Sequence, residues 1–224
     1  MKRHLRASSL YLTLVAALSG LLPGCASTPA TTTLLALPPV ALPARAPAGA
    51  ASAPRASLRV LVVRRVEIPE YLQARAVRHR VDETRLEAWP QVAWAERLEV
   101  AMTRSIVDGL RQRLHGWAVC EGSCVNLKQD VSLTVDFGVL DFYAQGPKLD
   151  ARARWVMRTS EEPPKLSSGR WQSPADLQVG AGVSGQAAAF GAAAQAVAAD
   201  IAAQLERSAL PAAANQPLPL AGQR

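Results

Sequence analysis

The chain has 224 residues, of which 49% are hydrophobic, and a formal net charge of +7. This length is enough for one domain with a hydrophobic core. After the N-terminal segment, no apolar run is long and uninterrupted enough to cross a membrane, because even Ala187–Leu205 is broken by Gln195, Asp200 and Gln204. The composition therefore argues against a protein with several membrane spans.

The first 24 residues have the pattern of an export signal. Basic residues at Lys2, Arg3 and Arg6 precede an apolar run from Leu10 to Leu22, which is too short to span a bilayer. The run ends in Leu22-Pro23-Gly24-Cys25, which resembles the lipobox of bacterial lipoproteins. We expect a signal peptide over residues 1–24 and lipidation of Cys25. The alternative is an ordinary secretory signal followed by an unrelated cysteine.

The residues after Cys25 indicate where the anchored chain resides. By analogy with proteobacterial sorting, Ala26 and Ser27 resemble an outer-membrane address. Several acyl chains make such anchoring effectively permanent. We expect the protein at the periplasmic face of the outer membrane, where its basic charge suits anionic head groups or acidic partners and nucleic acid is not a partner.

Residues 25–57 are rich in Ala, Pro and Thr and predict a flexible tether, with Thr33–Leu37 as a candidate edge strand. The folded domain is expected over residues 58–208. It opens with a β-branched run, Leu58–Val66, typical of a central strand. Residues 76–81 and 84–89 flank Asp82-Glu83 and predict a hairpin.

A helix is predicted from Trp94 to His115. Apolar residues recur about every four positions along it, and Gly116 follows as a C-terminal cap. The residues of this stripe are Trp94, Leu98, Met102, Ile106, Leu110 and Leu114.

Cys120 and Cys124 are the two cysteines besides Cys25. The periplasm oxidises close thiol pairs, so we expect a disulfide that stabilises the intervening turn. A metal site would need further ligands, and His115 nearby stands alone.

The second half predicts three strands and a helix. Residues 131–139 and 151–157 alternate apolar and polar side chains, and a third strand is expected near residues 169–171. A helix is predicted over 185–207, and the tail, residues 209–224, is expected to be disordered. The fold class is therefore α+β: a mostly antiparallel sheet with two amphipathic helices packed on one face.

Catalytic and cofactor sites are not indicated. Gly180-Ala181-Gly182-Val183-Ser184-Gly185 matches the dinucleotide-binding pattern, but no strand follows its helix to complete a βαβ unit. His79 and His115 belong to no recognisable triad or metal pattern. We expect no enzymatic activity, no cofactor and no metal.

The arginines at 152, 154 and 158 alternate along one predicted strand and form a basic stripe. Arg152, Arg154 and Arg158 have two interpretations: a solvated face that discourages edge aggregation, or a contact for acidic head groups or an acidic partner.

Two motifs carry a resemblance to a known family. Val66-Glu67-Ile68-Pro69-Glu70-Tyr71-Leu72 and Trp94-Ala95-Glu96-Arg97-Leu98, with the lipobox and the order of elements, resemble the PqiC/YmbA family of auxiliary lipoproteins for ABC-type transport. The resemblance implies a non-catalytic docking component of an ABC/MCE-type system that moves lipid or another hydrophobic molecule between membranes. The implied partners are an MCE-domain periplasmic protein and an inner-membrane permease, with a homo-oligomer also plausible.

Tyr71 and Trp94 are candidate partner contacts within those motifs, although both also fit folding roles at element ends. The competing hypothesis is an outer-membrane assembly or cell-wall factor that binds a barrel protein, lipopolysaccharide or a murein synthase.

Overall fold

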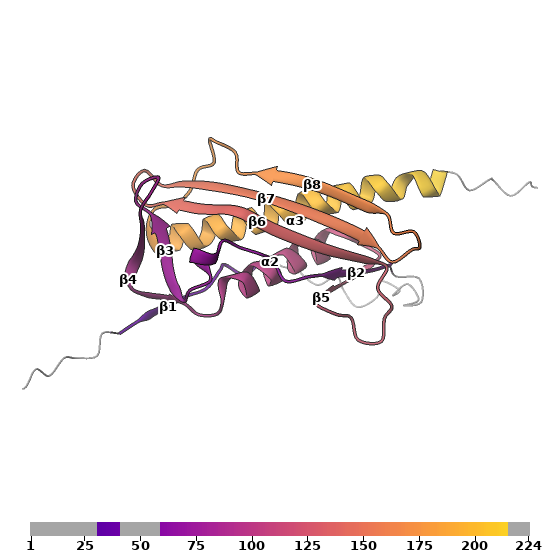
Figure 1. The fold of residues 1–224 in the computed structure, drawn as a ribbon, viewed down its shortest axis with the longest axis horizontal. Helices are drawn as coiled ribbons and strands as arrows, with labels where there is room; N and C mark the ends of the chain where they lie inside the picture. Colours follow the sequence, from indigo (N-terminus) through magenta and orange to yellow (C-terminus); the bar gives the residue numbers. More distant parts are fainter. Residues whose placement is uncertain (1–30, 41–58, 215–224) are drawn as a thin grey trace, which may run out of the picture. The chain divides into compact units, whose positions relative to one another are not determined.

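The computed structural model describes residues 31–40 and 59–214, with side chains of the last helix described as far as residue 208. The predicted signal peptide, Cys25 and most of the predicted tether lie outside these residues. The part described contains one sheet and two long helices (Figure 1). The strands are β1 (Thr33–Leu35), β2 (Arg59–Val63), β3 (Ala76–Arg80), β4 (Leu86–Trp94), β5 (Trp117–Glu121), β6 (Val131–Tyr143), β7 (Lys148–Thr159) and β8 (Leu166–Gln172). The helices are η3 (Glu70–Leu72, a 3-10 turn), α2 (Leu98–Arg113) and α3 (Gly182–Ala214).

β6 organises the sheet. Along one edge it pairs with β7 over its whole length, and β7 pairs in turn with β8. Along the other edge it pairs first with β2 and, at Tyr143, with β3, which leads to β4 and β1, while β5 lies beyond β2. The longest ladders are antiparallel, as expected, but the pairings of β2 with β5 and β6 and of β1 with β4 are parallel. The fold is therefore α+β with a mixed sheet.

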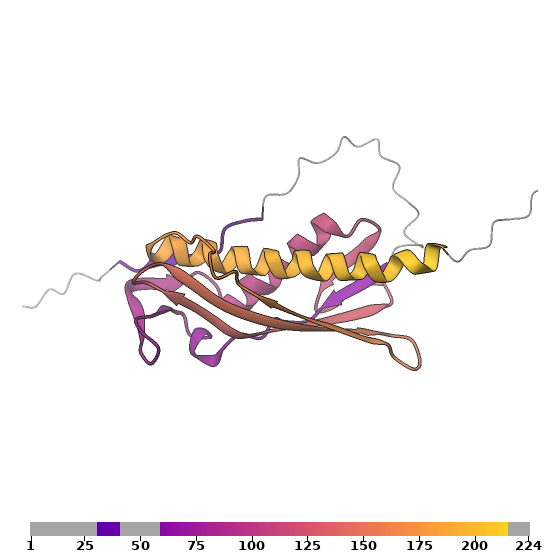
Figure 2. The same ribbon diagram turned by 90° about the horizontal axis from the view of Figure 1, so that it is seen from above.

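Both helices cover the same face of this sheet, as the alternation in β6 and β7 predicted. Figure 2 shows α2 and α3 on one side of the strands and nothing comparable on the other. Leu133, Val135 and Trp155 point to the helices and are at most 2% exposed. Burying such side chains is the main favourable contribution to folding.

α3 is apolar and long enough, from Gly182 to Ser208, to meet the length and composition test for a membrane span. However, 56% of the window tested is buried inside the fold. It packs closely on α2 at Gly109, where an added Cβ would lie 2.9 Å from the Cβ of Ala198. We therefore interpret it as a core helix.

Four local features differ from the sequence expectations. The helix predicted from Trp94 begins at Leu98, because Trp94 ends β4 and pairs with Leu35 of β1. β5 was not predicted; it follows α2 and lies parallel to β2. The edge strand expected within the tether is β1, and α3 continues to Ala214, into the range expected to be disordered.

Candidate functional site

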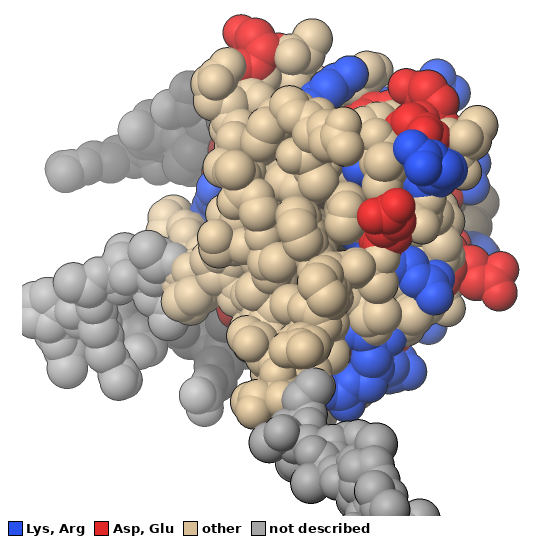
Figure 3. All heavy atoms as spheres, turned by 90° about the vertical axis from the view of Figure 1, so that its left-hand side faces the viewer, with Lys and Arg blue, Asp and Glu red and all other residues tan. Residues whose placement is uncertain are grey.

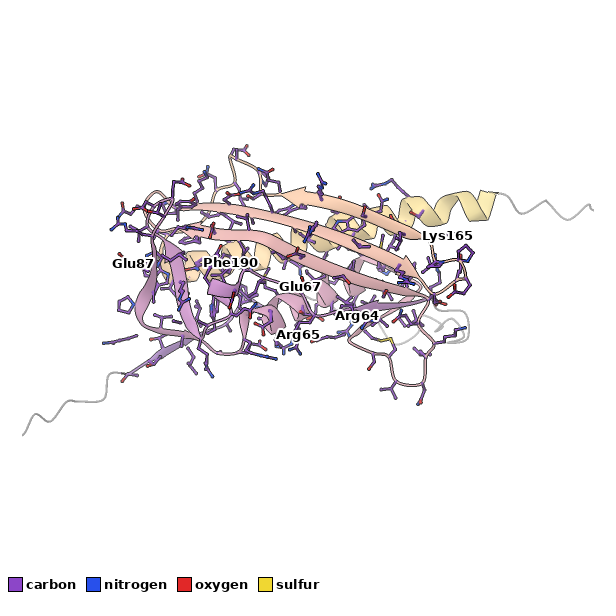
Figure 4. The ribbon with its side chains drawn as sticks, viewed as in Figure 1. Arg64, Arg65, Glu67, Glu87, Lys165 and Phe190 are labelled. Carbon is purple, nitrogen blue, oxygen red and sulfur yellow. A yellow bond between two sulfur atoms is a disulfide. The ribbon has the colours of Figure 1, made fainter. Side chains whose placement is uncertain are left out.

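The face of the sheet opposite the helices is open. On it lie the outward side chains of β6, β7 and β8, including Arg152, Arg154 and Arg158, all of them exposed as the alternation predicted. β8 adds Arg170, which pairs in register with Arg154. Figure 4 views this face, with the strands in front of the helices. Four arginines from two neighbouring strands thus share one surface.

These arginines are only partly neutralised. The Arg154 Nε donates to the Asp136 Oδ2 of β6 at 2.7 Å, and Arg152 lies 3.4 Å from the Asp150 carboxylate. Within residues 59–208, neither Arg158 nor Arg170 has a recorded ion pair. The arginine side of this face therefore keeps an excess of positive charge, which favours anionic groups.

A hollow of about 660 Å³ lies among these side chains, which we call the arginine hollow. Its lining includes Asp136, Arg152, Arg154, Arg170 and Gln172. Gly138 lies at its edge, next to a β-bulge in β6, and an added Cβ there would meet nothing within 4 Å. The missing side chain of Gly138 therefore keeps the surface open at this point.

A second hollow, of about 500 Å³, adjoins the first and shares Asp136 and Gly138 with it. It lies against the segment after β2, which crosses beside β6: the Glu67 amide donates to the Val135 carbonyl at 3.0 Å, and the Phe137 amide donates to the Glu67 carbonyl at 2.9 Å. Glu67 and Glu99 contribute carboxylates to its lining, so we call it the glutamate hollow. Arg65 lies there as well (Figure 4).

Sequence reasoning found the arginines of β7 but missed Glu67, Asp136, Gly138 and Arg170. Each was visible as a polar or small residue at an outward position. Their convergence depends on cross-strand register, which alternation within one strand does not reveal.

Tyr71, in η3, is half-buried and hydrogen-bonded inside the fold. Its hydroxyl donates to the Asp141 Oδ1 of β6 at 2.7 Å, and Arg80 Nε lies 3.1 Å from the other oxygen of that carboxylate. Burial, followed by the bond to Asp141, raises the pKa of Tyr71 to about 12. Asp141 is only 7% exposed, so this cluster pairs a buried charge and fixes η3 to β3 and β6.

Trp94 is 2% exposed, and its ring stacks on Phe190 of α3 with 6.1 Å between centroids. Its side chain therefore lies in the core. The neighbouring Trp89 donates to Gln186 Oε1 at 2.7 Å, and the Gln186 amide donates to the Arg78 carbonyl at 2.6 Å. The tryptophans of β4 thus hold the start of α3 against the β3–β4 hairpin.

Cys120 and Cys124 form the expected disulfide, with their Cα atoms 5.4 Å apart. It closes the turn that follows β5. The nearby loop exposes Val125 and Leu127, whose side chains are 84% and 42% accessible.

The glycine pattern before α3 has a steric explanation. A Cβ on Gly185 would lie 1.9 Å from the carbonyl oxygen of Gly180, and Gly182 has φ of +70°. The backbone can approach itself this closely only without side chains. Among the residues that the structure describes, no group of three or more His, Cys, Asp or Glu side chains could hold a metal ion.

The β1–β4 end of the domain differs from the open sheet face in charge. Figure 3 views this end and shows its charged side chains gathered toward one side, beside a broad uncharged area. Residues 32–40 contain no charged side chain, and neither does α3 before Asp200.

Comparison with known proteins identifies the family. The family model described as "ABC-type transport auxiliary lipoprotein component" matches residues 40–202. The chain belongs to this family. The match covers the open sheet face, both hollows and most of α3, so the surface described above is part of the family domain.

Solved structures share the fold. An uncharacterised protein is 17% identical, with a TM-score of 0.57 over 78% of this chain and 99% of that chain. Protein XCC0632 from Xanthomonas campestris, described with the family name DUF330, is 15% identical, with a TM-score of 0.48 over 80% of this chain and 97% of that chain. A search of curated proteins finds no match.

Proposed function

We propose that this chain is the outer-membrane lipoprotein of an ABC/MCE-type transport system, where it docks the periplasmic bridge without catalysing a reaction. The family match over residues 40–202 carries the proposal, because it makes the chain an auxiliary lipoprotein component of ABC-type transport. The outer-membrane location, the MCE-domain partner and the inner-membrane permease go beyond that match.

The N-terminal sequence supports membrane anchoring. β1 begins at Thr33, eight residues after Cys25. Eight residues span at most about 28 Å when fully extended. A lipid on Cys25 would therefore keep β1 near the membrane, with a linker much shorter than the tether expected from composition.

The open face of the sheet supports docking. It carries exposed charges of both signs and two hollows, and no helix covers it. Partners recognise such surfaces by charge complementarity, which speeds association and fixes orientation.

The proposal is tested by crosslinking in intact cells with an affinity tag after Arg224, followed by mass spectrometry of the captured proteins. We expect an MCE-domain protein that leaves the outer-membrane fraction when Cys25→Ala removes the lipid site. A Cys25→Ser variant serves as a second non-lipidated chain and should behave in the same way. Capture of a barrel protein or a murein synthase, with no MCE-domain protein, would refute the proposal and favour an assembly factor.

A further inference from the structure

The open face carries one row of charges that changes sign across the sheet. Glu67 is bridged to Asp136 of β6, Asp136 pairs with Arg154 of β7, and Arg154 pairs with Arg170 of β8. Two carboxylates are thus followed by two guanidinium groups on neighbouring strands. The glutamate hollow and the arginine hollow lie at the two ends of this row.

The inner two charges are satisfied by each other, and the outer two are not. Arg154 Nε and Asp136 Oδ2 are 2.7 Å apart. Glu67 and Arg170 are exposed, and the part of the chain that the structure describes offers no recorded ion pair to either. The surface therefore presents one negative and one positive group to a ligand.

The spacing of these groups decides between ligand classes. Glu67 and Arg170 stand three strand positions apart, which is about 14 Å at an inter-strand distance of about 4.8 Å. In a phosphoethanolamine head group, four bonds of about 1.5 Å join phosphorus to nitrogen, so these atoms are never more than about 6 Å apart. A single zwitterionic head group cannot reach both charges.

An extended polypeptide can reach both. It rises about 3.4 Å per residue, so side chains four residues apart cover the same 14 Å. Volumes of about 660 and 500 Å³ lie within the range of about 300–1,000 Å³ found for ligand pockets, so each hollow has room for side chains.

We propose that the open face of β6–β8 binds a polypeptide segment of the transport partner that crosses the strands. An acidic side chain of that segment contacts Arg170 and Arg152 in the arginine hollow, and a basic side chain about four residues away contacts Glu67. This inference rests on the proposed function for the identity of the partner, and it adds the surface and the charge order of the bound segment.

The test places a photocrosslinking amino acid at Gln172, an exposed residue in the lining of the arginine hollow, in the full-length chain in intact cells. We expect an adduct with the MCE-domain protein. Arg170→Glu and Glu67→Arg should each reduce the adduct at least about fivefold, because reversal replaces attraction with repulsion. Arg207→Glu, an exposed arginine on α3 and thus on the helix side, is the matched charge control and should change nothing.

Gly138→Leu provides a test without a change of charge. An added Cβ at Gly138 meets nothing within 4 Å, so the larger side chain should enter the opening where the two hollows meet without disturbing the fold. We expect it to reduce the adduct at least about fivefold, while circular dichroism and membrane fractionation remain those of the unmodified chain.

The outcomes separate this inference from the proposed function. An adduct with phospholipid or with a second copy of the chain would overturn the inference, as would an adduct unaffected by Arg170→Glu, Glu67→Arg and Gly138→Leu. If the Arg224 tag still captures the MCE-domain protein in that case, the proposed function stands and the surface is wrong. A charge-dependent adduct with an identified protein outside the transport system would retain the peptide-binding surface and refute the proposed function.

Discussion

Gly169 of β8 and Trp155 of β7 form a cross-strand pair whose fit can be tested quantitatively. The two residues face each other in the ladder, and a Cβ on Gly169 would lie 2.2 and 2.5 Å from two ring carbons of Trp155. Ordinary carbon contacts are about 3.5–4.0 Å, so Gly169→Ala must displace the ring. The ring is 2% exposed, and its Nε1 donates to Asp200 Oδ2 of α3 at 3.2 Å, which leaves it little room to move.

The expected loss of stability follows from these contacts. Overpacking a core costs about 1–3 kcal/mol, and weakening a hydrogen bond to a charged group costs about 1.5–3 kcal/mol when the bond is lost entirely. Replacing a strand glycine by alanine returns about 0.5–1 kcal/mol. We therefore expect Gly169→Ala to lower the free energy of unfolding by about 2–3 kcal/mol.

The assay is guanidinium unfolding of the purified chain followed by circular dichroism. In a Trp155→Leu background the ring is absent, and Gly169→Ala should be neutral or stabilising by about 0.5–1 kcal/mol. Gly138→Ala in β6, where a Cβ meets nothing, is the matched control and should also not destabilise. An equal loss from Gly169→Ala with and without Trp155 would show that the ring contact is not the cause.

Three further substitutions test the other contacts. Tyr71→Phe should lower the free energy of unfolding by about 1.5–3 kcal/mol, since it removes a donor to the buried Asp141 carboxylate. Because the folded pKa of Tyr71 is raised from 10.0 to about 12, its contribution is complete below pH 10 and disappears as the pH rises toward 12, so alkaline unfolding of the phenylalanine variant should lack this component. Replacing Cys120 and Cys124 together by Ser should cost about 2 kcal/mol in denaturant midpoint experiments, the loop entropy of so short a closure, and no loss would contradict that account. Gln186→Ala should cost about 2–4 kcal/mol by thermal unfolding, because it leaves two partners on β3 and β4 unpaired, and a neutral effect would show that water replaces the amide.

The sequence by itself determined most of the secondary structure and the fold class. The period of two in β6 and β7 and the four-residue recurrence in α2 reflect the one-sided burial of each element. The same alternation identified Arg152, Arg154 and Arg158 as outward side chains of one strand. Such features depend on neighbours in the chain, so local patterns are enough to predict them.

Only the tertiary structure decided which distant residues meet. Trp94 continues the apolar stripe of the helix, yet it ends β4 because β1 provides backbone partners there and Phe190 packs on its ring. Tyr71 and Asp141 are 70 residues apart, and their contact requires β3, β6 and η3 to be assembled. The charge row from Glu67 to Arg170 likewise exists only in the registered sheet, since a shift of one residue in any strand would turn its side chain to the other face.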